Sequence, residues 1–217
     1  MVEKKIEAVI FDWNGTLIDD AWLSVKAMNR MLGKRDIPAI SVDYYNEIFE
    51  FPVINYYRTL GLDVENEWEE ISKEFVDYYL EDMSEIKLFE DVKKIIHYLK
   101  NNKIERGILS AMKHEWLNSH VEKLGVKDDF SFIQGVEDHY GEGKTHLAKN
   151  ILEKLNIPTE KILFIGDTVH DLEVSQTAGF KAVLVSRGHN SLKRLEESGA
   201  PVADSFEQII SFIENLH

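Results

Sequence analysis

The feature that most constrains the fold is the stretch from Ala8 to Leu17, Ala-Val-Ile-Phe-Asp-Trp-Asn-Gly-Thr-Leu. Its first four residues are apolar strand formers, and Asn14-Gly15 is strong turn chemistry, so the chain leaves a buried strand at that point. Asp12 is therefore expected at the carboxyl end of this strand. An aspartate before a turn is more often a cap than a catalyst, so its role depends on the rest of the chain.

Composition limits the class of protein. With 217 residues, 44% of them hydrophobic, the chain can bury a core and hold one domain with a large insertion or two small domains. A formal charge of −14 and a pI near 5.0 argue against general binding to nucleic acid or to an anionic membrane. The absence of cysteine excludes disulfides, and the polar opening does not resemble a signal peptide. We expect a cytoplasmic monomer or homodimer.

Strands and helices alternate along the chain after position 86. Strands are expected at 106–110, 130–133, 161–165 and 182–185, and helices at 91–99, 145–155, 172–178 and 206–216. Such alternation is typical of a parallel sheet covered by helices on both faces. The sequence therefore predicts an α/β fold, a three-layer Rossmann-like parallel sheet core.

A helical segment, unusually rich in aromatic residues, interrupts this pattern. We predict an inserted helical cap domain over 18–86, and a core domain made of 1–17 and 87–217. Aromatic residues at helical spacing usually pack inside a bundle, although they equally favour a substrate with an apolar portion. The proline-broken segment 49–52 is predicted to form a loop facing a ligand.

Polar residues follow several of the predicted strands, where an open parallel sheet binds its ligands. Asp12, Ser110 and Asp167 come at strand ends, Asp171 follows one helical turn later, and Lys144 begins a helix. Clustered carboxylates need a cation, and hard oxygen ligands suit Mg²⁺. A phosphate would bind beside the metal, within reach of the serine and the lysine, and an aspartate can attack phosphorus.

These residues resemble the motifs of the haloacid dehalogenase superfamily, in its phosphoglycolate-phosphatase-like branch with a helical cap after the first strand. The segment 12–17 is similar to the first motif, Ser110 to the second, Lys144 to the third and the segment 166–171 to the fourth. The resemblance covers essentially the whole chain. It implies a Mg²⁺-dependent phosphatase that acts on a small phosphorylated metabolite through an aspartyl phosphate.

The resemblance also implies a role for each metal-site residue. Asp12 is the nucleophile and a metal ligand, and the backbone carbonyl of Asn14 and the carboxylate of Asp167 are the other protein ligands. Asp171 supports the metal waters or orients the lysine; alternatively, it is only a helix cap. Thr16 is expected to hydrogen-bond within the loop and so to position the nucleophile.

Substrate binding is assigned in the same way. Ser110, Ala111 and Lys144 are expected to bind the phosphate. The resemblance makes the insertion a mobile cap that excludes water and sets specificity, so Arg30 and Arg58 are candidate contacts to an anionic substrate. The histidines show no shared metal-ligand spacing and are expected to be mostly exposed.

One residue departs from the family pattern. Hydrolytic members of this branch carry a second aspartate two residues after the nucleophile, whereas this chain has Asn14. An amide cannot act as the general acid and base, a contribution of about a hundred- to ten-thousand-fold. The protein is then a slow phosphatase, or one for aryl or acyl phosphates with good leaving groups, or a non-catalytic protein that binds phosphometabolites.

Two other chemistries remain open at this point. A resemblance to phosphonoacetaldehyde hydrolase, which forms a Schiff base on a cap lysine, makes Lys26 and Lys34 candidates. The dehalogenases of the superfamily need no acid, but Asp167 and Asp171 favour a metal-dependent site instead.

Overall fold

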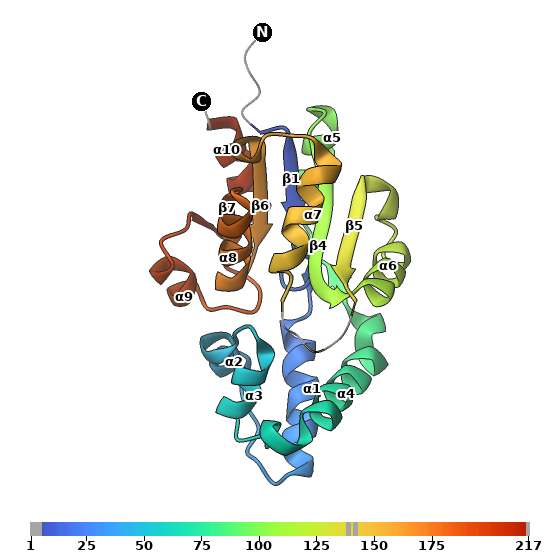
Figure 1. Ribbon diagram of the computed structural model, residues 1–217, viewed down its shortest axis with the longest axis vertical. Helices are drawn as coiled ribbons and strands as arrows, with labels where there is room; N and C mark the ends of the chain where they lie inside the picture. The colour runs from blue at the N-terminus through green and yellow to red at the C-terminus, as the bar shows by residue number, and fades with distance from the viewer. Residues whose placement is uncertain (1–5, 138–139, 141–142, 216–217) are drawn as a thin grey trace.

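The core of the protein is a six-stranded parallel sheet in the order β5-β4-β1-β6-β7-β8 (Figure 1). The computed structural model describes residues 6–137, 140 and 143–215. The strands are β1 (Ala8–Phe11), β4 (Glu105–Lys113), β5 (Phe132–Val136), β6 (Ile162–Gly166), β7 (Lys181–Val185) and β8 (Val202–Ala203). The predicted α/β fold with a parallel sheet is confirmed.

Helices cover both faces of this sheet. On one face lie α5 (Val92–Asn101), α6 (His114–Lys123) and α10 (Phe206–Asn215), and on the other α7 (Thr145–Leu155) and α8 (Val169–Ala178). The central strand explains this division, because neighbouring side chains of a strand point to opposite faces. Phe11 packs among the first set and Ile10 among the second, and both are fully buried.

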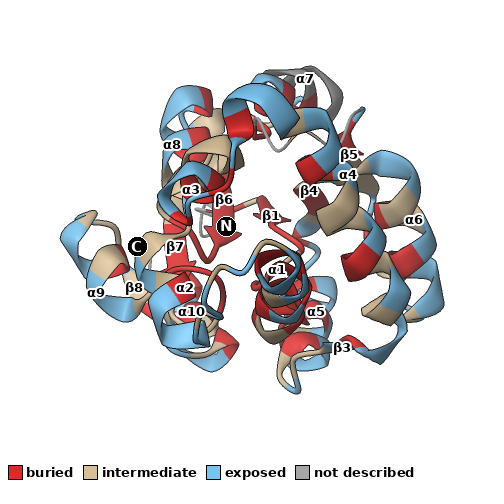
Figure 2. Cartoon of the chain, turned by 90° about the horizontal axis from the view of Figure 1, so that it is seen from below, coloured by how far each residue is buried: buried red, intermediate tan, exposed pale blue. Residues whose placement is uncertain are grey.

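A second group of elements lies beyond the carboxyl edge of the sheet (Figure 1). It contains α1 (Ala21–Lys34), α2 (Val42–Ile48), α3 (Val53–Thr59) and α4 (Val64–Asp82). The two chain crossings into it pair as short antiparallel strands, β2 (Ile18–Asp19) and β3 (Lys87–Leu88). Figure 2 looks at this group from below and shows α1 turning a largely buried surface inward. We propose that residues 18–86 act as an inserted domain, and we call them the cap.

Several elements differ from the sequence prediction. The strands β2, β3 and β8 have two residues each, too few to show any alternation in the sequence, and α9 (Leu192–Glu197) is a short helix of six. The strand predicted to end at Ser110 continues to Lys113, but its register with β5 shifts between Leu109 and Lys113. Such irregularities occur next to active sites, where they re-aim side chains.

The packing of β1 gives a test of the core. Phe11 meets Phe130 and Phe206 edge to face, and replacing it by alanine leaves a cavity. We expect Phe11→Ala to lower the free energy of unfolding by about 3–5 kcal/mol. Urea unfolding measures the loss, with the exposed Tyr44 replaced by alanine as the control. A loss below about 1 kcal/mol would contradict this account of the core.

Candidate active site

The centre of the site is a buried lysine between two aspartates. Lys144 Nζ contacts Asp12 Oδ1, lies 2.7 Å from Asp171 Oδ1 and donates to the carbonyl oxygen of Leu109 at 3.0 Å. Burial by itself would lower the pKa of Lys144, but the two carboxylates raise it above its usual value. The side chain therefore stays charged although only 2% of it is exposed.

Asp171 is both a helix cap and the partner of the lysine. Its Oδ2 accepts from the backbone N–H of Thr168 at 2.9 Å, from the Thr168 hydroxyl at 2.7 Å and from the backbone N–H of Asp167 at 3.1 Å. Together with Thr168 it forms a capping box at the start of α8. Burial tends to raise the pKa of Asp171, but Lys144 and the threonine lower it overall. These bonds fix the carboxylate that orients the lysine.

Asp167 is held from two sides. The Thr16 hydroxyl donates to its Oδ1 at 2.7 Å, and the backbone N–H of His189 donates to its Oδ2 at 2.7 Å. The sequence predicted that Thr16 would position Asp12; this was wrong, because the turn at Gly15 carries the threonine against β6. Gly15 has a φ of +67°, and a Cβ there would meet Asp167 Oδ2 at 2.3 Å.

Three carboxylates gather closely enough to share a metal ion. Asp12, Asp167 and Asp171 each offer an oxygen, and these oxygens lie within 4.8 Å of one another. Burial raises the pKa of Asp12 well above its ordinary value and that of Asp167 to about 6, although Lys144 and His189 oppose these shifts. A cation would relieve this cost, and an all-oxygen donor set suits Mg²⁺. The residues present therefore fit a magnesium ion.

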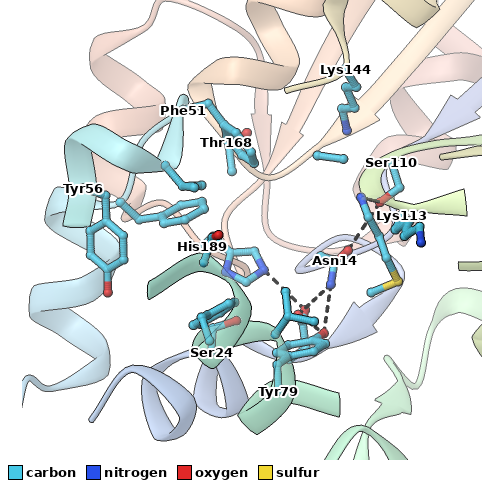
Figure 3. Close-up of a pocket in the computed structure, with 18 of the residues that line it drawn as sticks. Asn14, Ser24, Phe51, Tyr56, Tyr79, Ser110, Lys113, Lys144, Thr168 and His189 are labelled. Atoms are coloured by element: carbon cyan, nitrogen blue, oxygen red, sulfur yellow. Dashed lines mark hydrogen bonds and ion pairs between the residues drawn. The ribbon is translucent and has the colours of Figure 1, made fainter. Parts of the chain in front are cut away.

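Asn14 takes part in a hydrogen-bond network that the sequence did not predict. Its Nδ2 donates to Asp20 Oδ2 at 2.8 Å and to the Tyr79 hydroxyl at 3.0 Å, and Ser110 Oγ lies 3.4 Å from its Oδ1 (Figure 3). Asp20 is buried, and an aspartate at position 14 would bring a second carboxylate against it. An amide fits this place because it supplies a donor.

Asp20 and His189 form a second buried charge pair. Asp20 precedes α1 but makes no capping bond; it accepts from the backbone N–H of Gly15 and from the Tyr79 hydroxyl, both at 2.7 Å. His189 Nε2 lies 3.3 Å from Asp20 Oδ1, and its Nδ1 lies 2.7 Å from the Tyr45 hydroxyl. Burial tends to lower the pKa of His189, but Asp20 raises it to about 9.

His120 and His189 depart from the expectation of mostly exposed histidines, since they are 3% and 6% exposed. The signal that could have found His189 is its position, in a loop that follows β7 at the ligand-binding edge of the sheet. Gly188 beside it is a second sign, because a Cβ there would meet Asp167 Oδ2 at 2.1 Å. The loop thus packs closely against the carboxylate of Asp167.

The predicted phosphate-binding residues share one cavity of about 180 Å³ with Asp12 and Asn14, whereas Thr16 does not line it. Ser110, Ala111 and Lys144 line it, as do Asp12 and Asn14. Ser110 Oγ accepts from the backbone N–H of Met112 at 3.0 Å, so the hydroxyl group is directed by the irregular end of β4. The structure brings these five residues together.

The two arginines do not join them. Arg30 pairs with Glu81 at 2.7 Å, and Arg58 pairs with Glu65 at 2.8 Å, on exposed faces of the cap. Neither arginine lines the cavity. The structure therefore corrects the prediction that Arg30 and Arg58 contact the substrate. Arginines that pair with acidic residues on the surface of a helix are solvated, and such ion pairs contribute little to the stability of the fold.

Comparisons with known proteins agree with this geometry. The family model for haloacid dehalogenase-like hydrolases matches residues 9–185. The chain is 26% identical to a phosphoglycolate phosphatase of Pectobacterium atrosepticum (96% of this chain, 92% of the relative), and 24% identical to an N-acetylmuramic acid 6-phosphate phosphatase of Pseudomonas putida (85% of each).

A solved structure shows the same fold. It is a haloacid dehalogenase-like hydrolase from Streptococcus pneumoniae, 17% identical, with a TM-score of 0.81 over 97% of this chain and 99% of that one. No described helix of the chain is long and apolar enough to cross a membrane.

The Asp20–His189 pair gives a test of the site's electrostatics. Asp20→Asn removes the carboxylate that raises the pKa of His189 most, so we expect that pKa to fall from about 9. Histidine NMR titration measures it, with His189→Gln to assign the resonance. In the native protein the pKa of His189 is raised. The Asp20–His189 pair therefore stabilises the folded protein fully below about pH 6.5, and this stabilisation is lost as pH rises through about 9.

The control is Asp43→Asn, an exposed change near the start of α2 that should leave the titration as it is. A pKa that stays near 9 in Asp20→Asn would show that another group holds the imidazolium.

Proposed function

The chain belongs to the haloacid dehalogenase-like hydrolase family, and on this basis we propose that it is a Mg²⁺-dependent phosphatase of a small phosphorylated metabolite. The observation that carries the proposal is the buried contact of Lys144 with Asp12 and Asp171 at the ligand-binding edge of the sheet. A lysine beside a strand-end carboxylate provides both a phosphate-binding cation and a nucleophile in one cavity.

Each residue of the site has a place in this reaction. A carboxylate oxygen of Asp12 attacks phosphorus, the bond to the leaving oxygen breaks, and the resulting aspartyl phosphate is hydrolysed by water. Lys144 and Ser110 bind the phosphate oxygens. Asp12, Asp167 and the Asn14 carbonyl would hold Mg²⁺, which supplies neutralisation of the negative charge on phosphate and carboxylate when bound.

The position of the cap lysines weighs against phosphonoacetaldehyde chemistry. Lys26 pairs with Asp82 and Lys34 pairs with Glu74, each at 2.7 Å, and neither lysine lines the cavity. A Schiff base requires a neutral amine in contact with the substrate, whereas these are exposed ammonium groups in ion pairs. The carboxylate cluster likewise supports a metal-dependent site over dehalogenation.

Phosphate release separates the enzyme from a protein that only binds phosphometabolites. We expect the native chain to release phosphate from acetyl phosphate with Mg²⁺, to stop when EDTA is added, and to lose at least about a thousandfold in kcat in Asp12→Asn. Mass spectrometry of acid-quenched protein should find the phosphoryl group on Asp12. The exposed variant Asp43→Asn is the control. Ligand-induced stabilisation without turnover would favour the binding protein.

Asn14→Asp tests the missing acid and base. We expect kcat for an alkyl phosphate such as glycerol phosphate to rise by about a hundredfold, because a carboxyl group there can protonate the leaving alcohol. Asp20 is 2.8 Å from the present amide nitrogen, and its charge raises the pKa of the new group, which keeps a proton available.

The matched control is the double variant Asn14→Asp/Asp20→Asn, which exchanges the carboxylate and the amide across the same hydrogen bond. It should keep part of the gain and remove the repulsion between the two carboxylates, but it also removes the carboxylate that pairs with His189. If neither variant exceeds the native rate, position 14 is not an acid/base position.

A further inference from the structure

The cavity that begins at Asp12 continues into an aromatic compartment of the cap. Its walls include the rings of Tyr45, Phe49, Phe51, Tyr56, Phe75 and Tyr79. Figure 3 shows Phe51 and Tyr56 on one side of His189, with Asn14 and Ser110 on the other. The whole cavity, including the part beside Asp12, has a volume of about 180 Å³. The aromatic compartment is the apolar part of this one cavity.

The rings hold one another in place. Tyr45 and Phe49 each pack against Tyr56 with centroids 5.5 Å apart and steep interplanar angles, and Phe49 packs against Phe51 at 5.4 Å. Phe51 also stacks on His170 of the core, with centroids 4.7 Å apart. Walls fixed by such contacts form a preformed apolar surface, which ligands with matching rings fill at little conformational cost.

The cap contributes no cation to the wall of the cavity. Residues 18–86 are all described, and no lysine, arginine or histidine among them lines the cavity. The basic side chains on the wall, Lys113, Lys144 and His189, belong to the core, and His189 pairs with Asp20. The cap side of the cavity therefore favours a substrate whose part remote from the phosphate is apolar.

The amide at position 14 points to the same substrates. Without a proton donor, the leaving oxygen departs as an anion, and a phenol, with a pKa of about 10, forms that anion far more readily than an alkyl alcohol does. The leaving group must therefore be a good one. Because the aromatic lining of the cavity and the missing acid are independent observations, their agreement is informative.

We infer that the substrate is an aryl monophosphate, with its phosphate beside Asp12 and its ring in the aromatic compartment; this inference rests on the proposed phosphatase function. The carboxylate oxygen of Asp12 bonds to phosphorus as the bond from phosphorus to the phenolic oxygen breaks. The electron pair leaves with the phenolate, which solvent protonates. Water then cleaves the aspartyl phosphate, releasing inorganic phosphate and a proton and restoring the carboxylate.

Two ring-bearing substrates separate the leaving group from the shape. Phenyl phosphate and cyclohexyl phosphate have rings of similar size, so in the Mg²⁺-loaded protein kcat should be at least about a hundredfold higher for the phenyl ester. In Asn14→Asp this ratio should shrink. Compared with phosphoglycolate, phenyl phosphate should have a KM at least about tenfold lower.

The outcomes distinguish the two proposals. If phosphoglycolate is hydrolysed with a kcat/KM equal to or above that of phenyl phosphate, the aryl inference is overturned while the phosphatase stands. If cyclohexyl and phenyl phosphates turn over equally fast, the leaving-group argument is overturned. If no phosphate is released even from acetyl phosphate, both proposals fall.

A pair of variants on α4 tests the compartment itself. Ser72 is buried and lines the cavity, so Ser72→Leu places a larger side chain in the space for the ring. The kcat/KM for phenyl phosphate should fall at least about tenfold more than that for acetyl phosphate. Glu70→Leu, at an exposed position of the same helix, should leave the ratio unchanged. If Ser72→Leu leaves the ratio of the two kcat/KM values unchanged, and its thermal melt shows that the variant is folded, the ring binds elsewhere.

Discussion

The structure depends on the charge of one buried lysine. An isolated ammonium in the interior is very costly, and Lys144 is tolerated because Asp12 and Asp171 accept from it. Each partner belongs to a different element: Asp12 directly follows β1, and Asp171 lies in the first turn of α8, where it completes the capping box. The ion pairs therefore connect the start of α7 to the end of β1 and to the start of α8. Removing one partner would leave the other charges unbalanced.

A second buried carboxylate joins the cap to the core. Asp20 accepts from the loop after β1 and from Tyr79 of α4, and it forms an ion pair with His189 of the core, while His189 contacts Tyr45 of α2. The contact continues at Asn190, whose side-chain amide donates to the Phe49 carbonyl at 2.9 Å. The cap is thus positioned by polar contacts that begin at the metal-site loop.

Much of this arrangement could be predicted from sequence, because the signals lie within short segments of the chain. The strand ends at Asp12 and Asp167 follow from apolar runs and turn residues, and one edge of a parallel sheet brings such ends together. Asp20 could not be predicted, because it looks like a solvated helix cap until the cap folds over the core, and for His189 the only signal was its place in the loop after β7. Thr16 was placed in the right loop but given the wrong partner, since Asp167 lies far away in the sequence.

The substitution at position 14 is best understood together with its surroundings. The nearby titratable groups already have partners. Tyr79 donates to Asp20, and burial, together with the charge of Asp20, raises the pKa of the tyrosine hydroxyl well above the usual value. His189 is held between Asp20 and Tyr45. None of these groups is free to replace a catalytic acid. Under the proposed function, with Asp12 as the nucleophile and no such acid, easy bond cleavage comes from the substrate, and the aromatic compartment is where such a substrate would be selected.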